Sequence, residues 1–272
     1  SIEIPANIGS IEQCAFEGCD QLKTITVPLR FMLEDMSFWE SIGINRIKTE
    51  VKCNDPVYKQ ILNGSLTPTD LPDTLESAVA KVYIYALSQS SNENKTEVLA
   101  ELLDKVASDK YIECLSYAVK ELNLTAITIP ASIESIGKEA FRQCQSLESV
   151  TFAEGSQLKR IDEKAFLNSN ALTTVEIPDS TEDIGYPSFE YCENLASLTL
   201  PLRFASDVST HRFIGIAKKT KVKCNDPVYN QILNGSLTSD LPETLDSTVA
   251  KAYIHALSLS SNENKIEVLA EL

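Results

Sequence analysis

Histidine is almost absent from this chain of 272 residues, which contains only His211 and His255. Nucleophilic sites built from cysteine or serine need an imidazole base within hydrogen-bond reach. His255 lies in a helical pattern where an internal copy of the sequence has Tyr85, and His211 lies in an irregular stretch. Neither position requires imidazole, so the sequence predicts a protein that is not an enzyme.

Basic residues are also scarce. The chain has 24 lysines and arginines against 39 aspartates and glutamates, a formal net charge of -15. Such a charge repels phosphate backbones and anionic lipid surfaces alike. We therefore expect no nucleic-acid partner.

Long apolar runs and cofactor motifs are missing as well. No run approaches the roughly 18 to 20 apolar residues that a membrane span requires, so we expect no membrane insertion within this segment. The chain starts inside a repeat, and any signal peptide would lie outside it. Glycine-rich phosphate loops, metal-spaced histidine or cysteine clusters and calcium loops are lacking, which predicts no cofactor and no metal.

Cysteine pairs of the CxxC type are lacking too, although the chain has seven cysteines. Cys19, Cys144 and Cys192 share one slot of a repeat, in which another copy has Ser169. A slot that accepts both residues is typical of a small buried position rather than a disulfide partner. The cysteine pattern is compatible with a reducing compartment and with an oxidising one.

Cys53 and Cys224 belong to a heptapeptide, KCNDPVY, that occurs unchanged in both copies of a longer segment. A thiol just ahead of a helix can have a lowered pKa, which makes a cysteine-dependent enzyme a remote alternative. The favoured interpretation is that both cysteines turn inward as small apolar residues.

What the sequence does have is a short repeat, written three times between Leu124 and Pro201 and once more at the N-terminus. Prolines or their equivalents recur every 23 residues, with one interval of 25 that carries an insertion around Gly155 and Ser156. A fixed period of this size is typical of a solenoid. Each unit contains an L-x-x-V-x-F spacing, which predicts a short strand with these residues turned inward. The phenylalanines after each strand, Phe141 and Phe166 among them, are expected to fill the space between coils.

The repeat string IP-x-S-I-x-x-I-G-x-x-A-F-x-x-C-x-x-L resembles the BspA-like (Treponema pallidum type) leucine-rich repeat. The resemblance covers residues 1–30 and 123–201. Thr181, Glu182, Ser188 and Ser169 depart from the pattern in single coils. The resemblance implies a leucine-rich repeat solenoid.

The residues between the repeats have helical patterns and belong to no recognised family. After PLRF at 28–31 the repeat loses its register and leads to a strand-like segment, Glu50 to Cys53. A helix should then start with Asp55 as N-cap and Pro56 at its first position, and end before Gly64. Further helices are predicted over 73–88, with a capping box from Asp73 to Glu76, and over 92–106 and 108–122.

The segment from Lys52 to Leu102 recurs from Lys223 to Leu272 with one deletion and conservative changes. We therefore predict an α+β fold in which solenoid blocks of about 23-residue period alternate with all-α helical-hairpin modules, tandemly duplicated. The expected divisions are 1–53, the end of a first repeat block; 54–122, a first helical module; 123–224, a second repeat block; and 225–272, a truncated second helical module. The second copy stops in a predicted helix, so we expect a piece of a longer protein.

Outward strand positions are the candidate binding residues, because solenoids present extended surfaces to partners. Threonine also suits any exposed strand, which is the plainer interpretation of each single residue. The candidates are Thr128, Glu148, Thr151, Thr173, Glu176 and Thr199.

Together these features predict a non-catalytic protein that binds a protein or glycan partner. The resemblance implies a surface adhesin of bacterial type, placed at the cell surface or secreted. An intracellular scaffold or effector is the main alternative, because the odd and unpaired cysteines suit the cytoplasm.

Overall fold

The computed structural model describes residues 1–32, 34, 36–91, 93–205, 214–237, 245–260, 265 and 269. His211 lies outside the described residues. The chain divides into two compact units, 1–122 and 123–272, each described below by itself.

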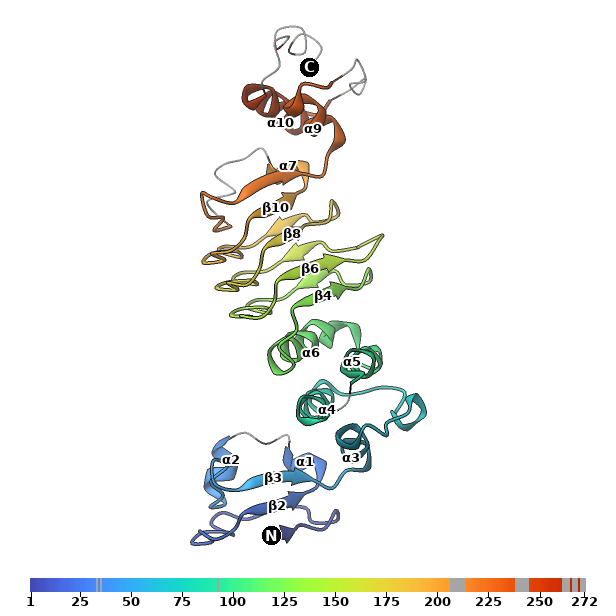
Figure 1. Cartoon of the computed structure of the whole chain (residues 1–272), viewed down its shortest axis with the longest axis vertical. Coiled ribbons are helices and arrows are strands. Elements are labelled where there is room, and N and C mark those ends of the chain that lie inside the picture. The colour runs from blue at the N-terminus through green and yellow to red at the C-terminus, as the bar shows by residue number, and fades with distance from the viewer. Residues whose placement is uncertain are drawn as a thin grey trace. The chain divides into compact units, whose positions relative to one another are not determined.

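The second unit is built on a five-stranded parallel sheet of order β11-β10-β8-β6-β4. Its strands are β4 (Ala126–Ile129), β6 (Ser149–Phe152), β8 (Thr174–Glu176), β10 (Ser197–Leu200) and β11 (Lys221–Cys224). Figure 1 shows four of these strands stacked in chain order. Their inward residues are buried, apart from Phe152 and Val222, which are half-buried. The predicted strands are confirmed, and so are their inward faces except at Phe152.

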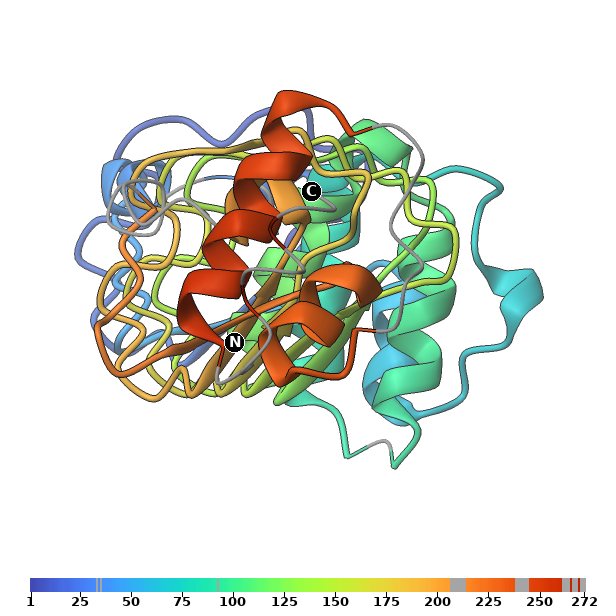
Figure 2. The same ribbon diagram turned by 90° about the horizontal axis from the view of Figure 1, so that it is seen from above.

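A second set of backbone contacts runs along the return segments of the same coils. The short strands β5 (Ser135–Ile136), β7 (Arg160–Ile161) and β9 (Asp183–Ile184) form a parallel sheet of their own. Beyond them, the Phe141 N–H donates to the Ala165 carbonyl at 2.7 Å and the Phe166 N–H donates to the Ser188 carbonyl at 2.9 Å. Successive coils are thus bonded on both sides, and they project onto one another when viewed from above (Figure 2).

Phenylalanine rings fill the space between these coils, as predicted. The rings of Phe141 and Phe166 stack with centroids 5.4 Å apart, and those of Phe166 and Phe189 with centroids 5.2 Å apart. All three side chains are buried almost completely. The Thr181, Ser188 and Ser169 departures are also buried, and Ser169 Oγ donates to the Phe141 carbonyl at 2.6 Å.

The first unit begins with a three-stranded parallel sheet, β1 (Ile2–Glu3), β2 (Thr24–Val27) and β3 (Glu50–Cys53). The short helices α1 (Leu29–Met32) and α2 (Met36–Ser41) lie between β2 and β3. The core beside this sheet consists of Phe16, Ile25, Val27, Phe31, Trp39, Ile42 and Ile44.

Helices complete both units. In the first unit they are α3 (Pro56–Asn63), a 3-10 turn at Pro68–Asp70, α4 (Ser77–Gln89), α5 (Lys95–Asp104) and α6 (Ser108–Glu121). In the second they are α7 (Leu202–Ala205), α9 (Pro227–Asn234) and α10 (Ser247–Leu259). Within the described residues, no helix combines the length and the apolar character needed to cross a membrane.

The start of α3 has the predicted capping, and α9 repeats it. Asp55 Oδ1 accepts from the Tyr58 N–H at 2.9 Å, and Asp226 Oδ1 accepts from the Tyr229 N–H at 2.7 Å. Both helices have proline in their first turn and end at a glycine in the left-handed conformation. The Tyr83 hydroxyl also donates to Asp55 Oδ1 at 3.1 Å, which ties α4 to the cap of α3.

The predicted capping box at Asp73 is wrong. α4 begins at Ser77, and Glu76 makes no side-chain cap hydrogen bond. Residues before it are extended, because the Leu75 N–H donates to the Lys105 carbonyl at 2.7 Å and Leu75 forms a parallel bridge with Val106. In α10 the residue equivalent to Glu76 is Asp246, whose shorter side chain does cap the helix.

The prediction that the shared cysteine slot is buried holds for Cys144 and Cys192 and is wrong for Cys19, which is exposed. Cys19 lies in the first coil, where residues 12–15 and 17–21 are all exposed.

The repeat register after PLRF is also kept better than the sequence suggests. β3 pairs in parallel with β2, and β11 with β10, so each block gains one further strand after its last recognisable repeat. The segment that leads to this further strand packs closely on the preceding coil in each unit. A Cβ on Gly43 would lie 2.6 Å from the Glu17 nitrogen, and one on Gly215 would lie 2.8 Å from the Glu190 nitrogen. Both glycines have positive φ, a conformation that favours glycine.

Gly185 and Gly137 occupy the same repeat slot and offer a matched test of this close packing. A Cβ on Gly185 would lie 2.6 Å from the Glu163 nitrogen, whereas one on Gly137 would meet nothing within 4 Å. Gly185→Ala should lower the free energy of unfolding by about 1–3 kcal/mol, because backbone must shift to admit the methyl group. Gly137→Ala should be neutral or slightly stabilising. Urea unfolding of both variants checks this, and equal stabilities would contradict the packing described.

Candidate binding surface

The outward side chains of the five-stranded sheet form rows, because parallel strands pair residues of the same repeat slot. We call one of these the threonine row: Thr128, Thr151, Glu176, Thr199 and Lys223. Thr128 pairs with Thr151, and Thr199 pairs with both Glu176 and Lys223. The pairing of β6 with β8 ends at Val150 and Val175, and Thr151 and Glu176 are the next residues along the two strands.

Of the six predicted site residues, five are exposed and Thr199 is half-buried. Four of them belong to the threonine row. Glu148 and Thr173 lie just before β6 and β8, outside the strands, and are joined by a bond from the Thr173 hydroxyl to the Glu148 carbonyl of 3.1 Å. The structure therefore places four of the six residues in one row and the other two in a separate pair outside the strands.

Two hydroxyl groups of the threonine row, those of Thr128 and Thr151, are hydrogen-bonded to each other. Thr128 Oγ1 and Thr151 Oγ1 are 2.9 Å apart, and Thr151 Oγ1 also lies 3.2 Å from the Ile127 carbonyl. These bonds orient the side chains while leaving them exposed, so that hydroxyl groups remain open to a partner.

A second row on the same face was missed by sequence reasoning. It runs through the other outward position of each strand, and its members are Ala126, Ser149, Thr174, Ser197 and Lys221. The alternation of inward and outward residues in each strand is the signal that could have found it. Lys221 and Lys223 belong to β11, whose place in the sheet no repeat motif indicates.

A hollow of about 650 Å³ opens at the carboxyl ends of β6 and β8. We call it the insertion hollow, because the inserted Gly155 and Ser156 form part of its wall. Thr151 and Glu176 of the threonine row line it. So do Asp179, Ser180 and Asn225, together with apolar groups of residues 150–153 and 177–178.

The side chain of Asn225 forms hydrogen bonds with two residues that line the insertion hollow. Its Nδ2 donates to the Ile177 carbonyl at 2.7 Å and to Asp179 Oδ1 at 3.0 Å. Both partners are acceptors, so the NH₂ group must face them and the orientation of the amide is settled. Its Oδ1 then faces elsewhere. That buried oxygen and Ser180 Oγ have no hydrogen-bond partner among the described residues.

The first unit has a hollow of about 510 Å³, unrelated to the predicted residues. Arg46, Tyr85, Tyr117 and Glu121 line it, as do Lys81 and Glu113, which form an ion pair. Burial raises the pKa of the Tyr117 phenol to about 12, so that this hydroxyl stays protonated and can donate a hydrogen bond. No sequence motif marks this place.

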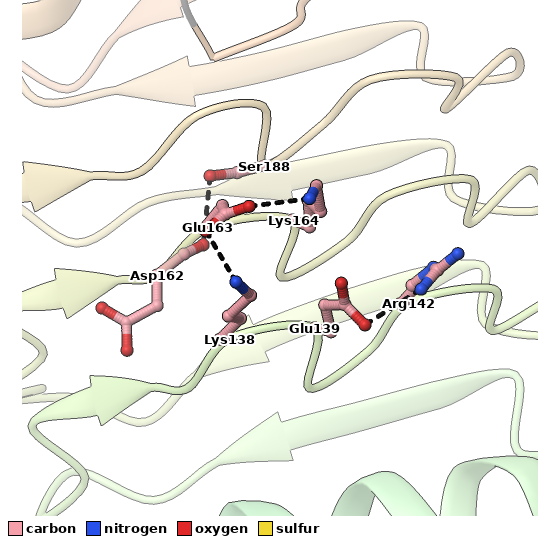
Figure 3. Close-up of polar contacts among 7 residues, drawn as sticks. All are labelled: Lys138, Glu139, Arg142, Asp162, Glu163, Lys164 and Ser188. Carbon is pink, nitrogen blue, oxygen red and sulfur yellow. Dashed lines mark hydrogen bonds and ion pairs between the residues drawn. The ribbon is translucent and has the colours of Figure 1, made fainter.

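Figure 3 shows a charged cluster on the return segments of adjacent coils. Glu163 accepts from Lys138 Nζ at 2.9 Å and from Lys164 Nζ at 2.7 Å, and Arg142 pairs with Glu139 at 2.9 Å. Bonds to Lys164 and Lys138 lower the pKa of the Glu163 carboxyl to about 2. A carboxylate held ionised in this way cannot serve as a general acid at neutral pH.

The cysteines give no support to nucleophilic chemistry. All seven are free, and Cys53 and Cys224 are buried. Burial raises the pKa of each of these two thiols to about 11, so only about one molecule in 10⁴ carries the thiolate at pH 7. The first unit also contains no histidine. Among the described residues, no three acidic, histidine or cysteine side chains form a group that could hold a metal.

Stacked coils with parallel strands, inward leucine slots and interleaved helices define a leucine-rich repeat protein of α+β class. The family model described as "BspA type Leucine rich repeat region" matches in six copies over residues 1–96 and 112–232. The chain therefore belongs to the BspA-type leucine-rich repeat family. The matched residues include α3 and α4, so the family model does not single these helices out as separate modules.

Two solved structures are similar to this chain. One, titled a leucine rich cell surface protein from Faecalibacterium prausnitzii A2-165, is 21% identical over 72% of this chain and 46% of its own, with a TM-score of 0.31. The other, titled a leucine-rich repeat protein from Bacteroides ovatus ATCC 8483, is 15% identical over 82% of this chain and 42% of its own, with a TM-score of 0.29. The chain spans less than half the length of either. No curated protein matches it.

Thiol accessibility gives a direct test of the cysteine environments. In the native protein, an excess of a disulfide reagent at pH 8 should modify Cys19 rapidly and Cys14 more slowly, because a hydrogen bond with Glu17 raises the pKa of the Cys14 thiol. The five buried thiols should stay unmodified until denaturant is added, because burial disfavours the thiolate. Absorbance and peptide mass mapping would measure this. Rapid modification of Cys53 or Cys224 would contradict it and revive the enzyme alternative.

The depressed pKa of Glu163 also predicts a pH dependence. A carboxyl group whose pKa is lower in the folded than in the unfolded protein stabilises the fold at pH values above its unfolded pKa. For Glu163 this contribution is lost as the pH falls toward 2. A carboxyl-detected NMR titration should show Glu163 ionised down to about pH 2. Replacing both partners, Lys138→Met and Lys164→Met, should return its pKa toward about 4.3. A wild-type pKa already near 4.3 would contradict the two ion pairs.

Proposed function

We propose that this chain is a non-catalytic binding protein that engages a protein or glycan partner through the outward face of its second repeat block. The observation that carries the proposal is the threonine row, where hydroxyl and carboxylate groups lie exposed in register across adjacent strands. A rigid sheet holds these groups in a fixed spacing, which lowers the entropy lost on binding. Family membership supports a binding role, since repeat proteins of this kind use extended surfaces for recognition.

The absence of catalysis is part of the same proposal. The raised pKa values of Cys53 and Cys224 favour inert thiols, and the two histidines of the chain offer few bases. The net charge of -15 argues against nucleic acid as the partner.

We further propose that repeat blocks alternate with helical modules in a tandem duplication, with divisions at 1–53, 54–122, 123–224 and 225–272. The identical cap geometry of Asp55 and Asp226 supports this arrangement. So does the matching bond from each asparagine side chain to an earlier coil: Asn54 Nδ2 donates to the Ile4 carbonyl at 3.2 Å, as Asn225 does to Ile177. The helices would cover the last strand of each block, whose edge would otherwise be open.

A surface adhesin of bacterial type is the particular role we favour, with the protein at the cell surface or secreted. This rests on family likeness, and fold alone does not determine function. An intracellular scaffold or effector is the second candidate, and the specific observation that favours it is the presence of seven free cysteines.

Arginine substitutions on the outward face test the binding role. Thr128→Arg with Thr174→Arg should reduce capture of the best ligand from an immobilised panel of glycans and extracellular proteins by at least about tenfold, because two bulky charges would occupy the face. Both residues are exposed, so the melting temperature should stay nearly unchanged.

The matched control is Glu182→Gln with Asp183→Asn, which changes the net charge by the same amount. These exposed residues lie at β9, in the separate short sheet. The control should retain capture. If the face variant captures the ligand as well as the wild type does, the outward face is not the binding surface.

A further inference from the structure

The insertion hollow exists because one repeat interval is longer than the others. Ala153 and Pro178 are 25 residues apart, whereas the equivalent positions of neighbouring coils are 23 apart. The additional residues include Gly155, which takes positive φ and has open space where a side chain would lie. The insertion therefore builds a wall at the carboxyl ends of the strands, where the pairing of β6 with β8 ends.

The charged groups of the hollow are acceptors, and they lie beside the hydroxyl groups of Thr151, Ser156 and Ser180. Glu176 and Asp179 carry two negative charges, and neither forms an ion pair with any described residue. Asn225 turns its NH₂ away toward Ile177 and Asp179, so it offers no free donor there. Among the described residues that line the hollow, none is lysine or arginine.

Apolar surface accompanies these acceptors. Phe152, Ile177 and Pro178 line the hollow beside the carboxylates. A ligand that matches both features has an apolar stem that ends in a cation with several donors. An arginine side chain has this form: three methylenes and a planar guanidinium with five N–H groups and no acceptor.

We propose that the insertion hollow receives an arginine side chain of a partner protein, with the guanidinium bound by Glu176 and Asp179. This deepens and rests on the proposed binding function, because Thr151 and Glu176 belong to both the hollow and the threonine row. Charge-assisted bonds to a guanidinium are stronger than neutral ones, and the negative chain attracts a basic partner. The site selects a basic protein segment over a neutral glycan.

The first unit supplies a natural comparison. In its equivalent coil, Asp179 is replaced by Ala6 and Ser180 by Asn7, while Glu3 matches Glu176. Asn54 repeats the bond of Asn225 to the earlier coil but has no carboxylate at the position of Asp179. The second charge therefore belongs to the second block, and an arginine should bind there in preference to the first block.

Peptide titration of the full chain tests the proposal. The probes are acetyl-Gly-Arg-Gly-amide and its citrulline counterpart, which keeps the shape without the charge. Amide NMR signals of Thr151, Glu176 and Asn225 should shift on titration with the arginine peptide, with an affinity at least about tenfold higher than for the citrulline peptide. Asp179→Asn, which keeps an acceptor for Asn225, should weaken arginine binding by a similar factor.

Other results would overturn the proposal. They are no shift with the arginine peptide, equal response to citrulline, or shifts of the same signals with a neutral oligosaccharide or with Ca²⁺ in place of the peptide. Unchanged capture of the panel ligand by Asp179→Asn would also overturn it. Failure of the proposed binding face would appear separately, as retained capture by the Thr128→Arg and Thr174→Arg variant, because neither residue lines the hollow.

Discussion

Hydrogen bonding between successive coils is the constraint on which the structure depends. Each coil of the second unit is bonded to its neighbours along two lines, the five-stranded sheet and the return segments. These bonds hold equal repeat slots in register, so that like side chains meet. Phe141, Phe166 and Phe189 stack for this reason, and the same register aligns the outward rows. Core and candidate surface are therefore two consequences of one backbone arrangement.

Register also limits what each coil can accept. Where the next coil approaches closely, as at Gly43, Gly185 and Gly215, a side chain would meet backbone atoms. At Cys19, a slot that is buried at Cys144 and Cys192 is exposed. The same residue type in the same slot thus has different roles, according to the coils on either side of it.

The insertion at Gly155 shows how a repeat acquires a local feature without losing its stack. Two added residues leave β6 paired with β8 at two positions, and a hollow opens where that pairing ends. Asn225 reaches back across the last coils to Ile177 and Asp179, so the floor of that hollow is held by a residue from the segment after β11. Residues that are far apart in the sequence are neighbours here, which is why no motif predicted the hollow.

The sequence by itself determined the repeat family, the inward strand residues, the phenylalanine stack and the caps at Asp55 and Asp226, because each follows from a local spacing or a local turn. Tertiary structure decided what depends on neighbours: that β3 and β11 join the sheets, that Leu75 is held extended by Lys105, that Cys19 is exposed, and that Ser149 and Thr174 form a second outward row. It also decided the ionisation of Cys53 and Cys224, since burial raises the pKa of a thiol and burial is a property of the fold.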